Sequence, residues 1–158
     1  MNLAAIREQI KTILAGVAGI GVIHNYERLA IDYNKMLALF QDADGRINGW
    51  TITRDETPER WITNIDYERI YEMVIRGYMG LQDGEGTEII FQDIVEDICD
   101  AFRGQDTLNA TCETINPEFG KLSGRSGIQV IIMEPRLFGN VLCHYCELRL
   151  GAQIKGQR

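Results

Sequence analysis

The stretch from Tyr67 to Arg103 constrains the fold most, because it combines a long strand pattern, a glycine-rich turn and an acidic helix pattern. In residues 67–81, the side chains alternate between two sides, and both sides are partly apolar. A strand of this kind either lies at the centre of a sheet with cover on both faces or presents one face to a partner chain. Gly84 and Gly86 then turn the chain into the helix.

The predicted helix over residues 87–103 has an apolar side and an acidic side. Its apolar residues recur at spacings of three and four, which is typical of a helix docked on a sheet: Ile90, Phe91, Ile94, Val95, Ile98, Ala101 and Phe102. Its acidic side consists of Glu88, Asp93, Glu96, Asp97 and Asp100. Residues 83–103 contain seven acidic residues and one basic residue, so they hold most of the net charge of −7. The acidic side is either a solvated surface, as charged helix faces usually are, or meets a neighbouring subunit or a channel that carries another acidic molecule.

The remaining patterns predict an α+β fold. Helical periods cover residues 2–16 and 31–40, and strand patterns cover residues 20–24, 47–54, 107–115, 127–133 and 141–150. We expect exposed connections at 55–66 and 134–140, a long flexible loop at about 116–127 and a frayed tail at 151–158. The expected architecture is a single domain over residues 1–158, with a mostly antiparallel sheet of about five or six strands and two main helices packed on one face.

The overall composition argues against several classes of protein. A net charge of −7 argues against a general nucleic-acid binder, which needs clustered Lys and Arg. No apolar run approaches the roughly 20 residues of a membrane span, and the N-terminal sequence lacks the pattern of a signal peptide. We therefore expect no membrane partner, and we expect the four cysteines to be reduced thiols.

The motifs that suggest ligand binding or catalysis each lack a necessary part. The Cys-His-Tyr-Cys motif at residues 143–146 alternates like a strand, which places its two cysteines on opposite faces. The acidic turn at 42–46 lacks the ligands at both ends of a calcium loop, and Asp83 and Glu85 in the glycine-rich turn would repel a phosphate. The chain contains two histidines and two serines, and the pattern supports no catalytic triad. We expect no catalytic residues, no metal and no cofactor, and therefore no enzyme activity.

Two stretches carry a resemblance to a known family. They are residues 40–50, Phe-Gln-Asp-Ala-Asp-Gly-Arg-Ile-Asn-Gly-Trp, and residues 75–81, Ile-Arg-Gly-Tyr-Met-Gly-Leu. Together with the chain length and the order of elements, they resemble the tail-terminator and related neck or tail-completion proteins of long-tailed bacteriophages and prophages, of the lambda tail-terminator type. The resemblance spans most of the chain and includes no catalytic motif.

The resemblance implies a structural function. Members of the family form a ring, commonly a hexamer, that caps the tail tube, stops its polymerisation and presents a surface to the head. The implied partners are other copies of the chain, the tail-tube protein and a head-completion or connector protein, while DNA passes through without specific binding. The implied location is the neck or tail of the virion, after synthesis in the cytoplasm of the bacterial host.

Two alternatives remain open at this point. If the chain is a phage protein of this family, it is either a tail terminator or a head-side connector. The alternative class is a small cytosolic α+β enzyme or ligand-binding domain with an unrecognised site. A deep pocket with convergent polar groups would favour that second class, and exposed apolar side chains on the sheet would favour the first.

A ring subunit needs two different surfaces that complement each other, because each contact in a ring is heterologous. The segments that could supply them are one side of the long strand, the acidic side of the helix, the mildly basic loop and the connection between the last two strands. Leu137 and Phe138 in that connection either dock on another protein or tuck over the end of the sheet. The candidate interface residues are Tyr71, Met73, Ile75, Glu88, Asp93, Glu96, Asp97, Asp100, Lys121, Arg125, Arg136, Leu137 and Phe138.

Overall fold

The computed structural model describes residues 2–157, which form three α-helices and six strands. In chain order the elements are α1 (Leu3–Ala15), β1 (Val22–His24), α2 (Tyr33–Phe40), β2 (Asn48–Arg54), β3 (Glu59–Trp61), β4 (Asp66–Gly80), the 3-10 turn η1 (Asp83–Glu85), α3 (Thr87–Phe102), β5 (Gln129–Phe138) and β6 (Val141–Gln157). Side chains cap the first two helices: Asn2 accepts a hydrogen bond from the Ala5 amide, and Asp32 accepts one from the Lys35 amide.

The six strands form one sheet in the order β1-β2-β4-β6-β5, and β3 pairs with the first part of β4. Every pairing is antiparallel except the short parallel contact between β1 and β2. The long strands β4 and β6 pair continuously from Asp66 and Gln157 at one end to Gly80 and Cys143 at the other. The predicted α+β fold with a mostly antiparallel sheet is confirmed, and β4 lies at its centre.

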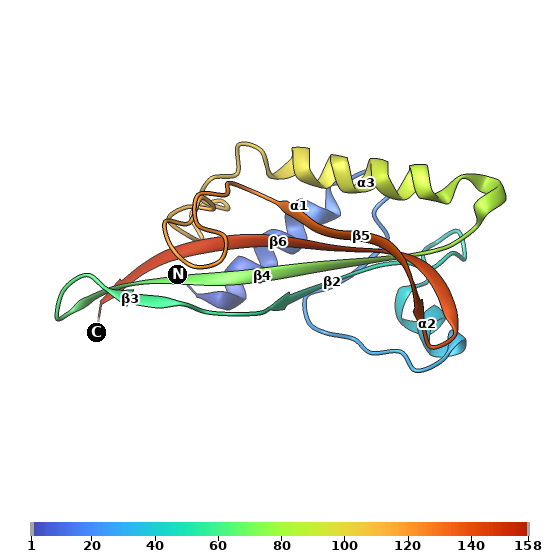
Figure 1. Ribbon diagram of the computed structural model, residues 1–158, viewed down its shortest axis with the longest axis horizontal. Helices are drawn as coiled ribbons and strands as arrows, with labels where there is room; N and C mark the ends of the chain where they lie inside the picture. The colour runs from blue at the N-terminus through green and yellow to red at the C-terminus, as the bar shows by residue number, and fades with distance from the viewer. Residues whose placement is uncertain (1, 158) are drawn as a thin grey trace.

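Helices α1 and α3 cover the first face of the sheet and enclose the main core (Figure 1). Ile6, Ile10 and Leu14 of α1 are fully buried, because they recur at helical spacing on the side that faces the sheet. Trp50 and Ile52 of β2 are also fully buried on this face, because residues two apart on a strand point to the same side. Two helices on one face were expected, and α1 and α3 are those helices.

The second face of the sheet is covered only towards its ends. At one end, α2 packs Met36 and Phe40 against the sheet residues Tyr78 and Cys143. At the other end, the segment at 116–122 folds over the sheet, where Leu122 is buried. The middle of this face carries polar and charged side chains.

Two segments at the C-terminal side differ from expectation. The tail at 151–158 was expected to fray, but residues 151–157 continue β6 because the first half of β4 offers them a pairing partner. Residue 158 lies outside the described residues. The expected connection at 134–140 is mostly strand, since β5 extends to Phe138 and only Gly139 and Asn140 form the turn. Both turn residues have positive φ values, as the tightest hairpins require.

The prediction of a strand at 107–115 is wrong. Leu108, Asn109 and Ala110 all adopt left-handed backbone conformations, which a strand cannot contain, and only Thr114 makes an isolated bridge to β6. The predicted connection at 55–66 also contains a strand, because β3 folds back on β4 as a hairpin. On α3, Ile90 was expected on the apolar face but is exposed.

Candidate functional site

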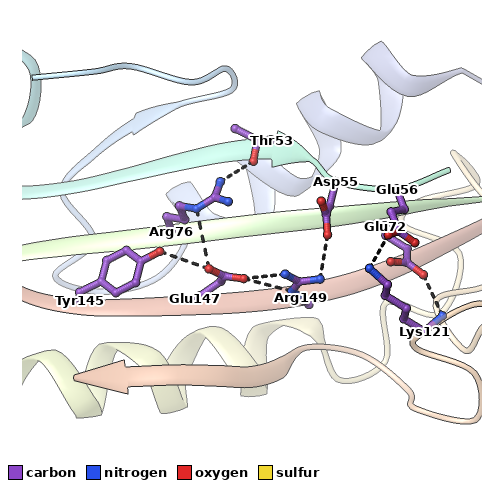
Figure 2. Close-up of polar contacts among 9 residues, drawn as sticks. All are labelled: Thr53, Asp55, Glu56, Glu72, Arg76, Lys121, Tyr145, Glu147 and Arg149. Carbon is purple, nitrogen blue, oxygen red and sulfur yellow. Dashed lines mark hydrogen bonds and ion pairs between the residues drawn. The ribbon is translucent and has the colours of Figure 1, made fainter. Parts of the chain in front are cut away.

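A charged network occupies the middle of the second face (Figure 2). Glu147 of β6 lies at its centre and is 8% exposed. Its carboxylate accepts hydrogen bonds from Arg149 at 2.8 and 3.1 Å and from the Tyr145 hydroxyl at 3.3 Å, and it lies 3.9 Å from the Arg76 guanidinium of β4. Alternation brings these side chains together, because every second residue of β4 and β6 points to this face.

The network extends to β2 and to the residue that follows its end. Arg76 donates a hydrogen bond to the Thr53 hydroxyl of β2 at 2.8 Å, and Arg149 forms an ion pair with Asp55 at 2.9 Å. The carboxylates hold the pKa of the Arg149 guanidinium above its usual range, and burial raises the pKa of the Tyr145 hydroxyl. The charges satisfy one another, so the arrangement joins three strands and offers no free acid or base for proton transfer.

Glu72 of β4 lies beside this network, under the segment at 116–122. It is 1% exposed, and its Oε1 accepts a hydrogen bond from the Lys121 amide at 2.9 Å. Its Oε2 is buried without a hydrogen-bond partner among the described residues. The Lys121 ammonium forms an ion pair with Glu56 (Figure 2), and Glu118 pairs with Arg60 of β3. The segment expected to be a long exposed loop is therefore tied to three parts of the sheet region.

A pocket of about 420 Å³ lies between the start of α3 and β5, and we call it the α3–β5 pocket. It is lined by Leu81, Asp83, Gly86, Thr87, Glu88, Ile89, Phe91, Gln92, Met133, Glu134, Pro135, His144 and Tyr145. His144 of β6 is 9% exposed, stacks on the Phe91 ring and places its Nε2 atom 2.8 Å from the Thr87 hydroxyl. Burial lowers the pKa of the His144 imidazole, although the nearby Glu88 charge acts in the opposite direction.

Large apolar side chains are exposed at both ends of the molecule. The tip of the β3–β4 hairpin exposes Trp61, Ile62 and Ile65, and we call these residues the hairpin surface. The opposite end, which contains α2 and the β5–β6 turn, exposes Leu29, Ile31, Tyr33, Leu137 and Leu142, and we call these the α2-end surface. Its two segments meet where the Ile31 backbone lies against Gly139. Figure 1 shows the hairpin and α2 at opposite ends of the long axis.

The structure separates the predicted interface residues into two groups. Tyr71, Met73 and Ile75 were expected to face a partner, and this is wrong, because all three lie in the main core and none is more than 7% exposed. The five acidic residues of α3, namely Glu88, Asp93, Glu96, Asp97 and Asp100, are all exposed.

The remaining candidates lie on other surfaces. Lys121 and Arg125 are exposed, and Lys121 is held by Glu56. Leu137 is 70% exposed, as expected of a residue that docks on another protein. Phe138 instead packs against the Tyr78 ring, as expected of a residue that covers the end of the sheet. Arg136 pairs with Glu134 and lies over the Tyr145 ring. The structure does not bring the acidic helix, the loop and the β5–β6 turn into one site.

The Cys-His-Tyr-Cys motif behaves as its alternation indicates. Cys143 belongs to the small core under α2, and Cys146 belongs to the main core under α1 and α3. The two thiols therefore lie on opposite faces of the sheet. Within residues 2–157, no group of three or more His, Cys, Asp or Glu side chains is placed to hold a metal ion.

Two features escaped the sequence analysis. The hairpin surface had a local signal, because Trp61, Ile62 and Ile65 stand out as apolar residues in a polar stretch. The His144–Thr87 contact had none, since the two residues are 57 positions apart and meet only through the fold.

Comparisons of the chain with protein-family models and with curated proteins found no match. Among the helices of residues 2–157, none has the length and apolar character needed to cross a bilayer.

Proposed function

We propose that the chain is a structural subunit of a phage or prophage head–tail joint, which assembles into a ring that caps the tail tube and stops its polymerisation. The observation that carries the proposal is the pair of different apolar surfaces at opposite ends of the molecule, the hairpin surface and the α2-end surface. Contiguous exposed apolar side chains are typical of surfaces that bind another protein.

Two different surfaces favour a head-to-tail assembly. In a two-fold dimer the same surface meets itself, so one of the two apolar ends would stay in water. A head-to-tail contact buries the hairpin surface of one copy against the α2-end surface of the next, and each added copy repeats the contact. Such contacts produce a ring where the rotation between copies closes. Six copies, as in the family that the sequence resembles, are the expected number.

The acidic side of α3 suits a protein through which DNA passes. Glu88, Asp93, Glu96, Asp97 and Asp100 are exposed on one helix, and their charge would repel the phosphate backbone wherever it comes near. The proposed partners are other copies, the tail-tube protein and a head-completion or connector protein, in the neck or tail of the virion. Both a tail terminator and a head-side connector fit these surfaces.

Light scattering of the purified protein over a range of concentrations and salt tests this proposal. We expect a mass of several chains, with six as the expected value, and little weakening by salt because the contact surfaces are apolar. A single-chain mass under every condition, also after mixing with tail-tube protein, would contradict the proposal.

A second candidate function, a ligand-binding domain, is favoured by the α3–β5 pocket. Its volume falls within the range of small-molecule sites, and the buried His144–Thr87 pair forms part of its lining. The two functions are compatible, because the pocket and the hairpin surface have no residue in common.

A further inference from the structure

We propose that the α3–β5 pocket binds a cationic group on an apolar stem, that is, an alkyl- or arylalkyl-ammonium or a guanidinium group. This site goes beyond the assembly role and does not depend on it. The chemistry is shared by free amines and by the Lys or Arg side chain of a partner protein, and the experiment below distinguishes these two sources.

The charges that line the pocket have one sign. Asp83, Glu88 and Glu134 are the charged residues of the lining, and none of the thirteen described lining residues is Lys or Arg. The Glu134 side chain points to the other face of the sheet, on the side of Tyr145, and forms an ion pair there with Arg136 at 2.6 Å. Asp83 forms no ion pair within residues 2–157, and Glu88 accepts a hydrogen bond only from the neutral side chain of Gln92. The lining therefore includes two carboxylates, those of Asp83 and Glu88, that have no cation partner within residues 2–157.

The position of these carboxylates excludes an anionic ligand. The first turn of a helix normally attracts anions, because its free amides and its dipole are positive. Here Asp83, Glu85 and Glu88 surround the first turn of α3 and already supply that negative charge. A phosphate or a carboxylate ligand would meet like charges, whereas an ammonium group would meet complementary ones.

The inner part of the pocket holds a fixed hydrogen-bond acceptor. The Thr87 hydroxyl accepts a hydrogen bond from the Gln82 amide at 3.0 Å and lies 3.2 Å from the Gln82 carbonyl and 2.8 Å from His144 Nε2. The hydroxyl has a single proton, so all three contacts are hydrogen bonds only if Thr87 donates to the carbonyl and His144 donates from Nε2. Burial lowers the pKa of the His144 imidazole and so favours its neutral form, and in the tautomer that donates from Nε2 the Nδ1 atom keeps a lone pair that can accept.

Apolar side chains supply the surface for the stem. Phe91, Met133, Leu81 and Pro135 line the pocket, and Ile89 at its rim is 67% exposed. A ligand with an aromatic or aliphatic stem would cover these carbons while its ammonium group meets the carboxylates. This combination of an apolar wall and a few placed polar groups is typical of small-molecule sites.

Titration with three probes, followed by NMR spectra of the full-length ¹⁵N-labelled protein, tests the proposal. The probes are 2-phenylethylammonium, the neutral isostere 2-phenylethanol and the anion 3-phenylpropanoate. We expect the ammonium probe to shift the amides of Thr87, Glu88 and His144 and to bind about tenfold more tightly than the alcohol, because charge-assisted hydrogen bonds are stronger than neutral ones. A capped glycine peptide with one central lysine is the second arm. Binding of this peptide assigns the site to a protein side chain, and binding of the free amine alone assigns it to a small molecule.

Two variants locate the charge that matters. Glu88→Gln should reduce the preference for the ammonium probe over the alcohol to about threefold or less, since it removes one of the two carboxylates without a cation partner. Glu96→Gln removes the same charge from the exposed side of α3, outside the pocket lining, and should leave the preference unchanged. Equal binding of ammonium and alcohol, equal effects of the two variants, or no amide shifts at about 10 mM probe would overturn the proposal.

Discussion

Gly77 lies directly opposite Trp50 across the β2–β4 pair, and the Trp50 ring occupies the space that a side chain at position 77 would need. A Cβ atom at position 77 would approach Trp50 Cζ3 to 2.3 Å and the Cys146 thiol to 2.8 Å. The absence of a side chain at position 77 therefore lets the largest residue of the main core lie flat against β4.

Gly77→Ala should destabilise the protein. The added methyl group would push the fully buried Trp50 ring out of its place, and overpacking of a close-packed core costs about 1–3 kcal/mol of unfolding free energy. Chemical denaturation measures this loss. Gly84→Ala is the matched control, because no atom lies within 4 Å of a Cβ built there, and it should stay within about 0.5 kcal/mol of wild type. Equal stabilities of the two variants would disprove the role of Gly77.

Glu147→Gln should also lower the unfolding free energy, by about 1–3 kcal/mol, because Arg149 and Arg76 would lose their shared, mostly buried carboxylate. Glu118→Gln makes the same change in the ion pair between Glu118 and Arg60, in which the Glu118 side chain is 64% exposed. Exposed ion pairs contribute little, so this control should change stability by less than about 1 kcal/mol. If both variants lose the same stability in urea denaturation, the network on the second face does not stabilise the sheet.

Protonation of His144 should weaken the fold at acidic pH. Burial lowers its pKa in the folded protein below the value of 6.5 that an unperturbed histidine has. Above that pH the imidazole is neutral in both states, and below it the unfolded chain binds the proton first. His144 therefore lowers stability as the pH falls through the unfolded pKa, with a slope of at most about 1.4 kcal/mol per pH unit.

Denaturation of wild type and His144→Gln at about pH 7.5 and at about pH 5 measures this contribution, because all other titratable groups are the same in the two proteins. The amide of Gln can still donate to the Thr87 hydroxyl. We expect the variant to lose less stability than wild type on acidification. A larger loss in the variant would mean that His144 is charged in the folded state.

The strands and helices with a strong periodic pattern were predictable from the sequence. Trp50 and Ile52 share the buried side of β2, and Phe91, Ile94 and Ile98 form the buried side of α3 at the expected spacing. Each of these side chains is placed by its own element, so local order is sufficient to predict its face.

The features that depend on a distant partner were not predictable. Residues 151–157 are polar in part, and they form a strand only because β4 extends far enough to pair with them. Met73 looks from the sequence like a surface for a partner chain, yet helices from both halves of the chain cover it. The His144–Thr87 contact and the network around Glu147 likewise arise from residues that the fold brings together.

The central claim is that the hairpin surface of one copy meets the α2-end surface of the next, and the mass of mixed variants tests it most directly. The hairpin variant carries Trp61→Glu and Ile65→Glu, and the α2-end variant carries Leu137→Glu and Leu142→Glu. These four side chains are exposed, so both variants should keep the circular dichroism spectrum of wild type.

In a head-to-tail assembly, each variant alone lacks one of the two surfaces and should be a monomer. An equimolar mixture still contains one intact pair of surfaces, so light scattering should show the mass of two chains and nothing larger. A mixture that stays monomeric while wild type assembles would contradict the account, and so would an α2-end variant that alone assembles as wild type does.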